Sequence, residues 1–276
     1  MKTIAWIPAG RAQYLKILIP YLLRDKGILD RVYFCVNTEN EGDIAYIHSM
    51  CKKYSDYFEC IYLDPGIKPN GSKTVRSFYK NFTEKNTIYL KIDDDICFLQ
   101  KGLLQDLIKF RKQNKQYFLV FANLVNTTLC SHIHQHLGAL NYKKGIYEWD
   151  PFCKLGWERG EGAENVHECF LAAIKNGKIN KFLFPRWEIP YFDRTSINLI
   201  CYFGEDSQIF SPLVQNAEDD ELFLSRTMPR QLLRINAICG KKIGAHFAYY
   251  TQRDYLEQTT TLLEQYYRVS KTLFEI

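Results

Sequence analysis

The sequence predicts an α/β domain in which helices cover both faces of a mostly parallel sheet. Apolar stretches of strand length alternate with amphipathic stretches of helix length through the first 125 residues. Of the 276 residues, 46% are hydrophobic, and no repeat or linker-like segment divides the chain. Alternation of this kind favours a parallel sheet, and the chain is long enough to bury one large core. We therefore expect a single compact domain over residues 1–276.

The first half of the chain predicts five strands with helices between them. Apolar runs rich in β-branched and aromatic residues indicate strands at residues 3–9, 31–38, 58–64, 87–95 and 116–125. Apolar residues at helical spacing indicate helices at about 12–23, 43–54, 74–82 and 102–113. Sheets built in this way bind ligands at the carboxyl ends of their strands.

The second half is less regular. A helix over residues 165–177 ends at Gly177, and residues 196–204 resemble a strand. A second helix, at 217–230, has acids in its first turn and Pro229 at its end. A third, amphipathic helix covers about residues 252–274. This last helix could cover the core, pair with a second copy in a homodimer, or lie on a membrane.

Composition narrows the class of partner. The formal charge is +5 and the pI is near 8.6, which mildly favours anionic ligands but is too small and scattered to indicate nucleic acid. Nine cysteines occur without a C-x-x-C pair, which favours reduced thiols. The N-terminus "MKTIAWIPAGR" is unlike a signal peptide, and no apolar run reaches the length of a spanning helix. We expect a cytoplasmic protein, at most peripheral to a membrane.

Three consecutive acids, Asp93, Asp94 and Asp95, end the apolar run "TIYLKI". In an extended strand Asp93 and Asp95 point to one side and Asp94 to the other. Two carboxylates about 4 Å apart repel by roughly 4 kcal/mol at an effective dielectric of 20, and a divalent cation offsets that cost. Oxygen ligands suit Mg²⁺ or Mn²⁺. The alternative is an acidic turn that precedes the helix after Gly102.

The segment "YLKIDDDI" resembles the D-x-D motif of nucleotide-sugar glycosyltransferases with the GT-A fold. The opening "IPAGRAQYL" is similar to the first strand and loop of that fold, which pack against the nucleotide. "AEDDELFLSR" resembles an acidic helix start near the acceptor in inverting members. "IGAHFAYYTQR" resembles a C-terminal segment of bacterial and viral polysaccharide glycosyltransferases, in which a His lies near the metal and diphosphate. The resemblance implies a GT-A-like, Rossmann-type sheet.

The resemblance also implies a metal site and a donor site. Asp93 and Asp95 would hold Mn²⁺ or Mg²⁺, which would bridge both phosphates of the donor. His246 would be a further metal ligand or a hydrogen-bond donor to a phosphate. Donor contacts are expected where the strands end and the third helix begins, from Pro8, Ala9, Gly10, Arg11, Asn37, Lys73, Arg76, Asp93 and Asp94.

The acidic run from Glu218 to Glu221 contains the candidates for a catalytic base. Inversion at the anomeric carbon needs a carboxylate that takes the proton of the acceptor hydroxyl. Asp219 is the first candidate and Asp220 the second. Acids at a helix N-terminus are also favourable without any catalysis, so capping is the alternative.

Together these features predict a glycosyltransferase that moves a sugar, most simply from a UDP-sugar, to a saccharide hydroxyl with inversion, in surface glycan biosynthesis. Residues 1–125 would bind the nucleotide-sugar donor, and residues 126–276 would bind the saccharide or glycan acceptor and include the C-terminal helix. Two other hypotheses remain open. One is a metal-dependent nucleotidyltransferase, and the other is a non-catalytic glycan-binding protein of the same fold.

Three other patterns carry less weight. "GIKPNGSKT" has one residue too many for a phosphate-binding P-loop, and Pro69 removes a backbone donor from it. "SHIHQH" would form a one-sided metal triad only on a strand, whereas its polar flanks favour a loop. Sugar stacking is a hypothesis for Trp149, Trp157 and Trp187, with core packing as the alternative.

Overall fold

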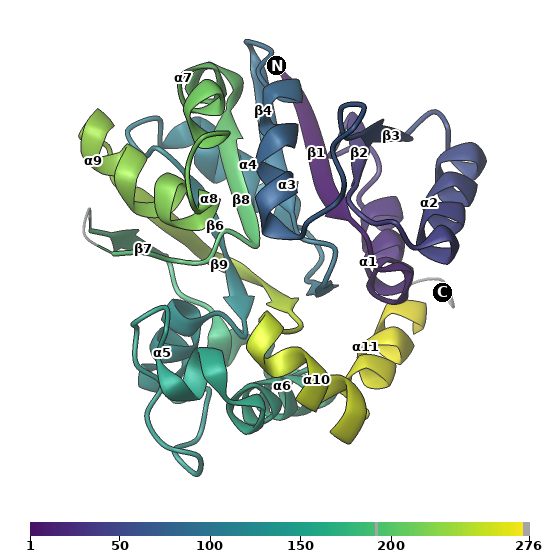
Figure 1. Cartoon of the computed structure of the whole chain (residues 1–276). Helices are drawn as coiled ribbons and strands as arrows, with labels where there is room; N and C mark the ends of the chain where they lie inside the picture. Colours follow the sequence, from purple (N-terminus) through teal and green to yellow (C-terminus); the bar gives the residue numbers. More distant parts are fainter. Residues whose placement is uncertain (191–192, 273–276) are drawn as a thin grey trace.

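The computed structural model describes residues 1–190 and 193–272 and has the expected α/β architecture, a single domain with helices on both faces of one curled sheet (Figure 1). Nine strands form that sheet in the described residues, in the order β3-β2-β1-β4-β8-β6-β9-β5, with β7 paired to β9. Their bounds are β1 Lys2–Ala9, β2 Arg31–Val36, β3 Phe58–Tyr62, β4 Thr87–Ile92, β5 Ile96–Leu99, β6 Val120–Val125, β7 Arg186–Ile189, β8 Leu199–Phe203 and β9 Asn236–His246.

Strand direction explains where a ligand site can form. Parallel pairing joins β3, β2, β1 and β4, and also joins β6 to β9. Because β8 is antiparallel to both β4 and β6, six of the nine described strands run in one direction and β5, β7 and β8 run in the other. The mostly parallel sheet is therefore confirmed, and the carboxyl ends of β1, β2, β4 and β9 lie at one edge.

Helical segments fill the connections. The longer helices of the first half are α1 Ala12–Arg24, α2 Glu41–Lys53 and α4 Leu103–Gln113, with the short α3 Ser72–Val75 and the 3₁₀ turn η1 Arg76–Asn81 between β3 and β4. The second half contains α5 Thr128–His136, η2 Lys154–Glu158, α6 Gly160–Lys175, η3 Ile179–Phe182, α7 Gly204–Val214, α8 Asp220–Leu222, η4 Phe223–Thr227, α9 Met228–Leu232, α10 Tyr250–Thr259 and α11 Leu262–Lys271.

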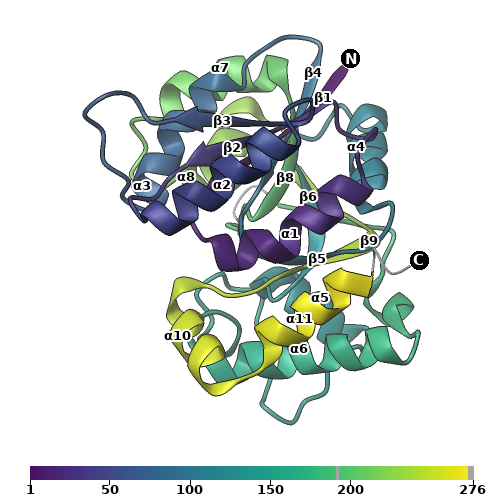
Figure 2. The same cartoon turned by 90° about the vertical axis from the view of Figure 1, so that its right-hand side faces the viewer.

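Two apolar cores form because side chains alternate along the buried strands. In β1, Ala5 and Ile7 face a core shared with α1, α4, α6 and α11, whereas Ile4 and Trp6 face a second core shared with η1, α5 and α7. Figure 2 shows α1 and α11 lying along the sheet on the first side. Trp6 is fully buried and donates a 2.8 Å hydrogen bond to the hydroxyl of Tyr202 on β8. The sheet is thus covered on both faces, as a parallel sheet requires.

The predicted C-terminal helix is two helices. α10 ends at Thr259, Thr260 is extended, and α11 begins at Leu262. The Thr259 and Thr260 hydroxyls donate to the carbonyls four residues earlier, and β-branched residues of this kind weaken a helix. α11 buries Leu262 and Tyr266 in the first core, so it covers the core. The last part of the predicted helix, to residue 274, lies outside the described residues, and no helix of the described chain is long and apolar enough to cross a membrane.

Several predicted elements differ in their ends, and two of these differences affect the acidic segments. The strand predicted at residues 87–95 stops at Ile92, and a turn carries the three acids into β5, which pairs with β9. The helix predicted at residues 217–230 is the short α8, a π turn and α9, with Pro229 in the first turn of α9 rather than at the end. Proline has no backbone N–H, and it fits there because the N–H groups of the first turn of a helix have no acceptor within the helix.

Candidate active site at the strand ends

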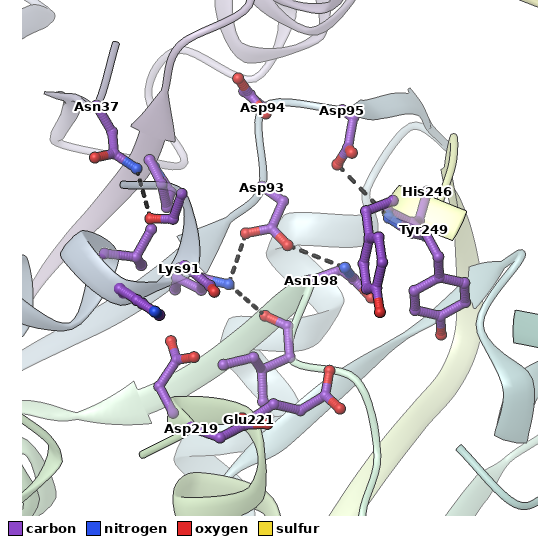
Figure 3. Close-up of a pocket in the computed structure, with 18 of the residues that line it drawn as sticks. Asn37, Lys91, Asp93, Asp94, Asp95, Asn198, Asp219, Glu221, His246 and Tyr249 are labelled. Carbon is purple, nitrogen blue, oxygen red and sulfur yellow. Dashed lines mark hydrogen bonds and ion pairs between the residues drawn. The ribbon is translucent and has the colours of Figure 1, made fainter. Parts of the chain in front are cut away.

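A cavity of about 780 Å³ opens at the carboxyl edge of β1, β2 and β4. The antiparallel strand β8 starts at this same edge, and the backbone N–H of Asp93, just after β4, donates a 2.8 Å hydrogen bond to the carbonyl of Asn198, just before β8. The last residue of β9, His246, also lies on the cavity wall. Strand order therefore places polar residues from distant parts of the chain around one space (Figure 3).

The structure brings nearly all the predicted site residues to this cavity. Its lining includes Pro8, Gly10, Arg11, Asn37, Lys73, Arg76, Asp93, Asp94, Asp95, Asp219, Asp220 and His246. Ala9 is the exception, because its side chain is buried in the core below the first loop. These positions are now placed in space, while their roles stay predictions.

Asp93 forms a polar pair that sequence reasoning missed. The Lys91 ammonium lies 2.6 Å from one carboxylate oxygen of Asp93 and donates a 3.1 Å hydrogen bond to the Ile197 carbonyl. Asn198 donates a 3.0 Å hydrogen bond to the other oxygen. Burial would lower the pKa of Lys91, but Asp93 and Asp220 outweigh it and raise that pKa. The available signal was a single lysine inside a strand whose other residues are all uncharged.

The expected division of the three acids is wrong. Asp94 and Asp95 both contact the Arg11 guanidinium, which donates a 3.1 Å hydrogen bond from Nε to Asp94 and a 3.0 Å hydrogen bond from Nη2 to Asp95. Asp93 instead faces Lys91 (Figure 3). The reason is that the strand ends at Ile92, so strand alternation does not extend through the acids. The Gly10 N–H also donates to Asp94, which ties the first loop to this turn.

Asp95 has one oxygen without a hydrogen bond. Its Oδ1 is buried without a partner and lies 3.7 Å from Nε2 of His246. The other ring nitrogen of His246, Nδ1, is 3.0 Å from the Asn126 carbonyl, so Nδ1 carries a proton that it donates to that carbonyl, and Nε2 faces Asp95. Burial would raise the pKa of Asp95, but Arg11, His246 and Arg253 outweigh it and hold that pKa below its ordinary value. The pair is a carboxylate oxygen and an imidazole nitrogen facing one another.

The second acidic cluster is held by an arginine. Arg194 donates a 2.7 Å hydrogen bond to Asp219 and another to Glu221, while Asp219 also accepts from the Leu222 N–H as the N-cap of α8. The alternative of helix capping therefore describes Asp219 directly. Asp220 is buried beside Tyr79, and burial raises its pKa against the opposing effect of Lys91. Neither Arg194 nor Lys91 was among the predicted residues.

The loop and helix that follow β3 are linked to the end of β2. Asn37 donates from Nδ2 to the Gly71 carbonyl at 2.9 Å and accepts from the Thr74 hydroxyl at 2.6 Å. These contacts fix the start of α3, which carries Lys73 to the cavity, and Arg76 follows it in η1. Gly71 has φ +50°, a conformation that glycine tolerates best. The near-miss to a P-loop is thus a turn anchored by Asn37.

An aromatic wall completes the cavity on the side of the second half of the chain. The rings of Phe152 and Trp157 meet edge to face at 5.2 Å, and Trp157 meets Tyr250 in the same way at 5.5 Å. All three line the cavity, and Phe152 and Tyr250 are exposed. Trp149 and Trp187, the other tryptophans considered for stacking, do not line this cavity.

The histidine cluster lies on α5 instead of a loop or strand. His134 is buried and hydrogen-bonds Asn123 at 2.7 Å. His132 and His136, one helical turn apart, have their rings next to one another on a different side. Within residues 1–190 and 193–272, no three His, Cys, Asp or Glu side chains are grouped so as to hold a metal ion.

Comparison with known proteins finds structural likeness only. No family model matches the chain, and no curated protein matches it. A CMP:2-keto-3-deoxy-manno-octonic acid synthetase complexed with CTP is 11% identical, with a TM-score of 0.49 over 96% of this chain and 99% of that one. A 4-diphosphocytidyl-2C-methyl-D-erythritol synthase from Anaerococcus prevotii is 10% identical, with a TM-score of 0.45 over 100% of this chain and 99% of that one. For another such synthase the identity is 16% and the TM-score 0.34, over 46% of this chain and only 62% of that protein.

The expectation of a glycosyltransferase is therefore wrong. The similar solved structures named here are nucleotidyltransferases and not glycosyltransferases. The two carboxylates of the expected D-x-D pair have different partners, because Asp93 faces Lys91 while Asp95 faces His246. Each identity is below 25% and each TM-score is below 0.5, so the likeness is one of fold alone.

Proposed function

We propose that the chain is a divalent-metal-dependent nucleotidyltransferase. It binds a nucleoside triphosphate at the carboxyl edge of β1, β2 and β4 and joins the nucleotidyl group to a sugar-type second substrate. The observation that carries this proposal is the unpartnered, buried Oδ1 of Asp95 facing Nε2 of His246, on the wall of a cavity that also contains Arg11, Lys73 and Arg76.

The charge of the cavity favours a nucleotide that arrives with a metal ion. Six basic and seven acidic described side chains line it, for a formal charge of −1; these are Arg11, Lys73, Arg76, Lys91, Arg194 and Arg253, with Asp93, Asp94, Asp95, Glu218, Asp219, Asp220 and Glu221. A triphosphate alone gains no net attraction from such a surface, whereas a metal-bound triphosphate carries less charge.

The residues present fit a divalent ion. Asp95 Oδ1 and His246 Nε2 are an oxygen and a nitrogen donor that lie 3.7 Å apart, and they would hold a divalent ion together. Mn²⁺ or Mg²⁺ would take its remaining ligands from phosphate oxygens and water. This pair replaces the Asp93, Asp95 and His246 set, because both oxygens of Asp93 already accept hydrogen bonds or pair with Lys91.

In the proposed reaction an oxygen nucleophile of the second substrate attacks the α-phosphorus. A new P–O bond forms there, the bond to the bridging oxygen of the β-phosphate breaks, and pyrophosphate leaves. A bound divalent ion would neutralise charge on the phosphate oxygens. Arg11, positioned by Asp94 and Asp95, would contact the phosphates. Lys73 in α3 and Arg76 in η1 would bind the pyrophosphate part of the nucleotide.

The two halves of the chain would divide the substrates. Residues 1–125 supply the strand-end loops and their cations, whereas residues 126–276 supply the aromatic wall of Phe152, Trp157 and Tyr250 and the Arg194 cluster. Exposed rings on a cavity wall stack on the apolar faces of sugars. CTP is the first nucleotide to test, because the names of the similar structures contain CTP or cytidyl groups.

The test is a coupled assay of pyrophosphate release. CTP, UTP, ATP and GTP are each combined with Mg²⁺ or Mn²⁺ and a panel of sugar phosphates and sugar acids, with the acceptors of the similar structures included. We expect release that requires the metal, one nucleotide and one acceptor class. Asp95→Asn should reduce the rate at least 100-fold, since a metal ligand and the negative charge that pairs with Arg11 are both lost.

Asp254→Asn is the matched control, because it removes the same charge from an exposed position on α10. Its rate should stay within about twofold of the wild-type rate, as expected for a surface change away from the site. Metal-independent release, or full activity in Asp95→Asn, contradicts the proposal.

A further inference from the structure

Two cysteines on adjacent elements lie in direct contact outside the cavity. Cys51 is in the last turn of α2, Cys60 is in the middle of the edge strand β3, and their Sγ atoms are 3.0 Å apart. Both are free thiols and both are only partly buried. A disulfide requires about 2.05 Å between sulfurs, so a shift of about 1 Å would close the bond.

Polar neighbours on the same surface make one thiol the better nucleophile. The hydrogen bond from Cys51 lowers the pKa of Cys60 against the opposing effect of burial, and the Tyr62 hydroxyl acts in the same direction. The same hydrogen bond raises the pKa of Cys51. The Tyr62 hydroxyl is itself hydrogen-bonded to Nε2 of His48, and Tyr62 is exposed. A thiolate on Cys60 therefore has two donors beside it and an approach from solvent.

We propose that Cys51 and Cys60 form a reversible dithiol–disulfide site, which reacts with a small-molecule disulfide and links α2 to β3. The inference rests on the contact of the two sulfurs, their partial exposure and the donors around Cys60, and it does not depend on the proposed function.

The reaction is a two-step thiol–disulfide exchange. The Cys60 thiolate attacks one sulfur of the small disulfide, which forms a mixed disulfide and releases one thiolate that takes up a proton. The Cys51 thiol then loses its proton to solvent and attacks Sγ of Cys60, which releases the second small thiol. In total the protein loses two hydrogens and the small disulfide gains them.

The other cysteines provide the contrast. Six of them, Cys35, Cys97, Cys130, Cys153, Cys201 and Cys239, are buried, and burial raises the pKa of each one. Cys169 is partly buried like the pair, but the sulfur contact described for it is a 3.3 Å hydrogen bond from the Asn141 amide. Cys169 is therefore the matched single thiol.

The experiment treats the folded, reduced protein with glutathione disulfide, quenches with acid, alkylates the remaining thiols and maps the products by mass spectrometry. The wild type should lose two alkylatable thiols per chain and give one linked peptide pair, Cys51 with Cys60, and dithiothreitol should reverse both. Cys51→Ser should stop at a glutathione adduct on Cys60. Cys169→Ser should behave as the wild type does.

Three results would overturn the proposal. The first is that both cysteines remain fully alkylatable in the folded wild type after treatment. The second is that Cys169 reacts as fast as Cys60. The third is that Cys60→Ser gives the adduct on Cys51 as fast as Cys51→Ser gives it on Cys60. Circular dichroism of each variant, recorded first, ensures that the thiols are compared in folded chains.

Discussion

At the scale of single residues, Lys91 is a buried cation in the site that depends on its partner carboxylate. Its side chain is 5% exposed, it lies in a strand whose other side chains are uncharged, and it pairs with Asp93 just after that strand. A buried charge without its partner is strongly destabilising, whereas a pair replaced as a unit costs much less. The ion pair therefore makes a specific contribution that a double-mutant cycle can separate.

Lys91→Met should destabilise the protein by about 3 kcal/mol, because it leaves Asp93 beside Asp220 without a cation. The double variant Lys91→Met/Asp93→Asn should recover about half of that loss, since the uncompensated charge is gone. Urea denaturation followed by circular dichroism measures both. Equal losses in the single and double variants would show that the pair is not the source of the effect.

The burial of Asp220 predicts that the stability of the protein depends on pH. Burial raises its pKa in the folded state, so the folded protein binds this proton more tightly than the unfolded chain does. The stability that this group contributes is present below the unfolded pKa, near 3.9, and is lost as the pH rises through the folded pKa. Asp220→Asn keeps a neutral side chain, so its stability relative to the wild type should rise between pH 3 and pH 7.

Denaturation curves at several pH values check this prediction, with Asp254→Asn as the control for loss of one exposed charge. A difference between Asp220→Asn and the wild type that stays constant, or that falls as the pH rises, would contradict the assignment.

Much of the site could be located from sequence at the level of residues, but its pairings could not. The acidic turn, Arg11 and His246 could be found because polar residues at strand ends stand out against apolar runs. The partners of Asp93 could not, since Asn198 is 105 positions away and is placed by the antiparallel strand β8. The assumed alternation of the acids failed because no local signal shows that the strand stops at Ile92.

At the level of elements, α11 shows how one face of a helix is buried. Tyr266 is fully buried, and its hydroxyl is 2.8 Å from Nδ1 of His167 on α6, whereas its neighbour Tyr267 is 37% exposed. The two side chains are identical and adjacent in sequence, so they differ mainly in how far each one is buried.

Tyr266→Ala should cost about 3–5 kcal/mol, as for other large buried rings, and Tyr267→Ala should cost under about 0.5 kcal/mol. Thermal or urea unfolding of the two variants tests this packing. A similar small loss in both would mean that α11 does not cover the core in solution.

The elements of the first half were predictable because each strand is a short apolar run followed by a helix with one apolar face, as in β1 and α1. β9 was not recognised as a strand, because Gly240, Lys241 and Lys242 interrupt its apolar pattern where its register with β6 shifts. α7 contains Pro212 and begins at Gly204, both of which usually indicate a break. Tertiary pairing overrides these local signals.

At the level of the whole molecule, the sheet gathers charges from both halves of the chain at one edge. The cavity there has nearly balanced charges, and the buried Asp95 Oδ1 and His246 Nε2 face one another across 3.7 Å. The expectation of a glycosyltransferase came from short motifs, and motifs of that size specify a strand-end site for a nucleotide more strongly than they specify a reaction. The fold class followed from alternation, whereas the chemistry depends on side-chain directions that only the assembled sheet fixes.

The most direct test of the central claim is the shift in Tm caused by nucleoside triphosphates with and without Mg²⁺, measured for the wild type, Asp95→Asn and Asp254→Asn. We predict that one triphosphate raises the wild-type Tm by about 5 °C at a concentration near 100 times its Kd, and only when Mg²⁺ is present. Asp95→Asn should lose that shift and Asp254→Asn should keep it. An equal shift with EDTA, an undiminished shift in Asp95→Asn, or no shift with any triphosphate would contradict the account.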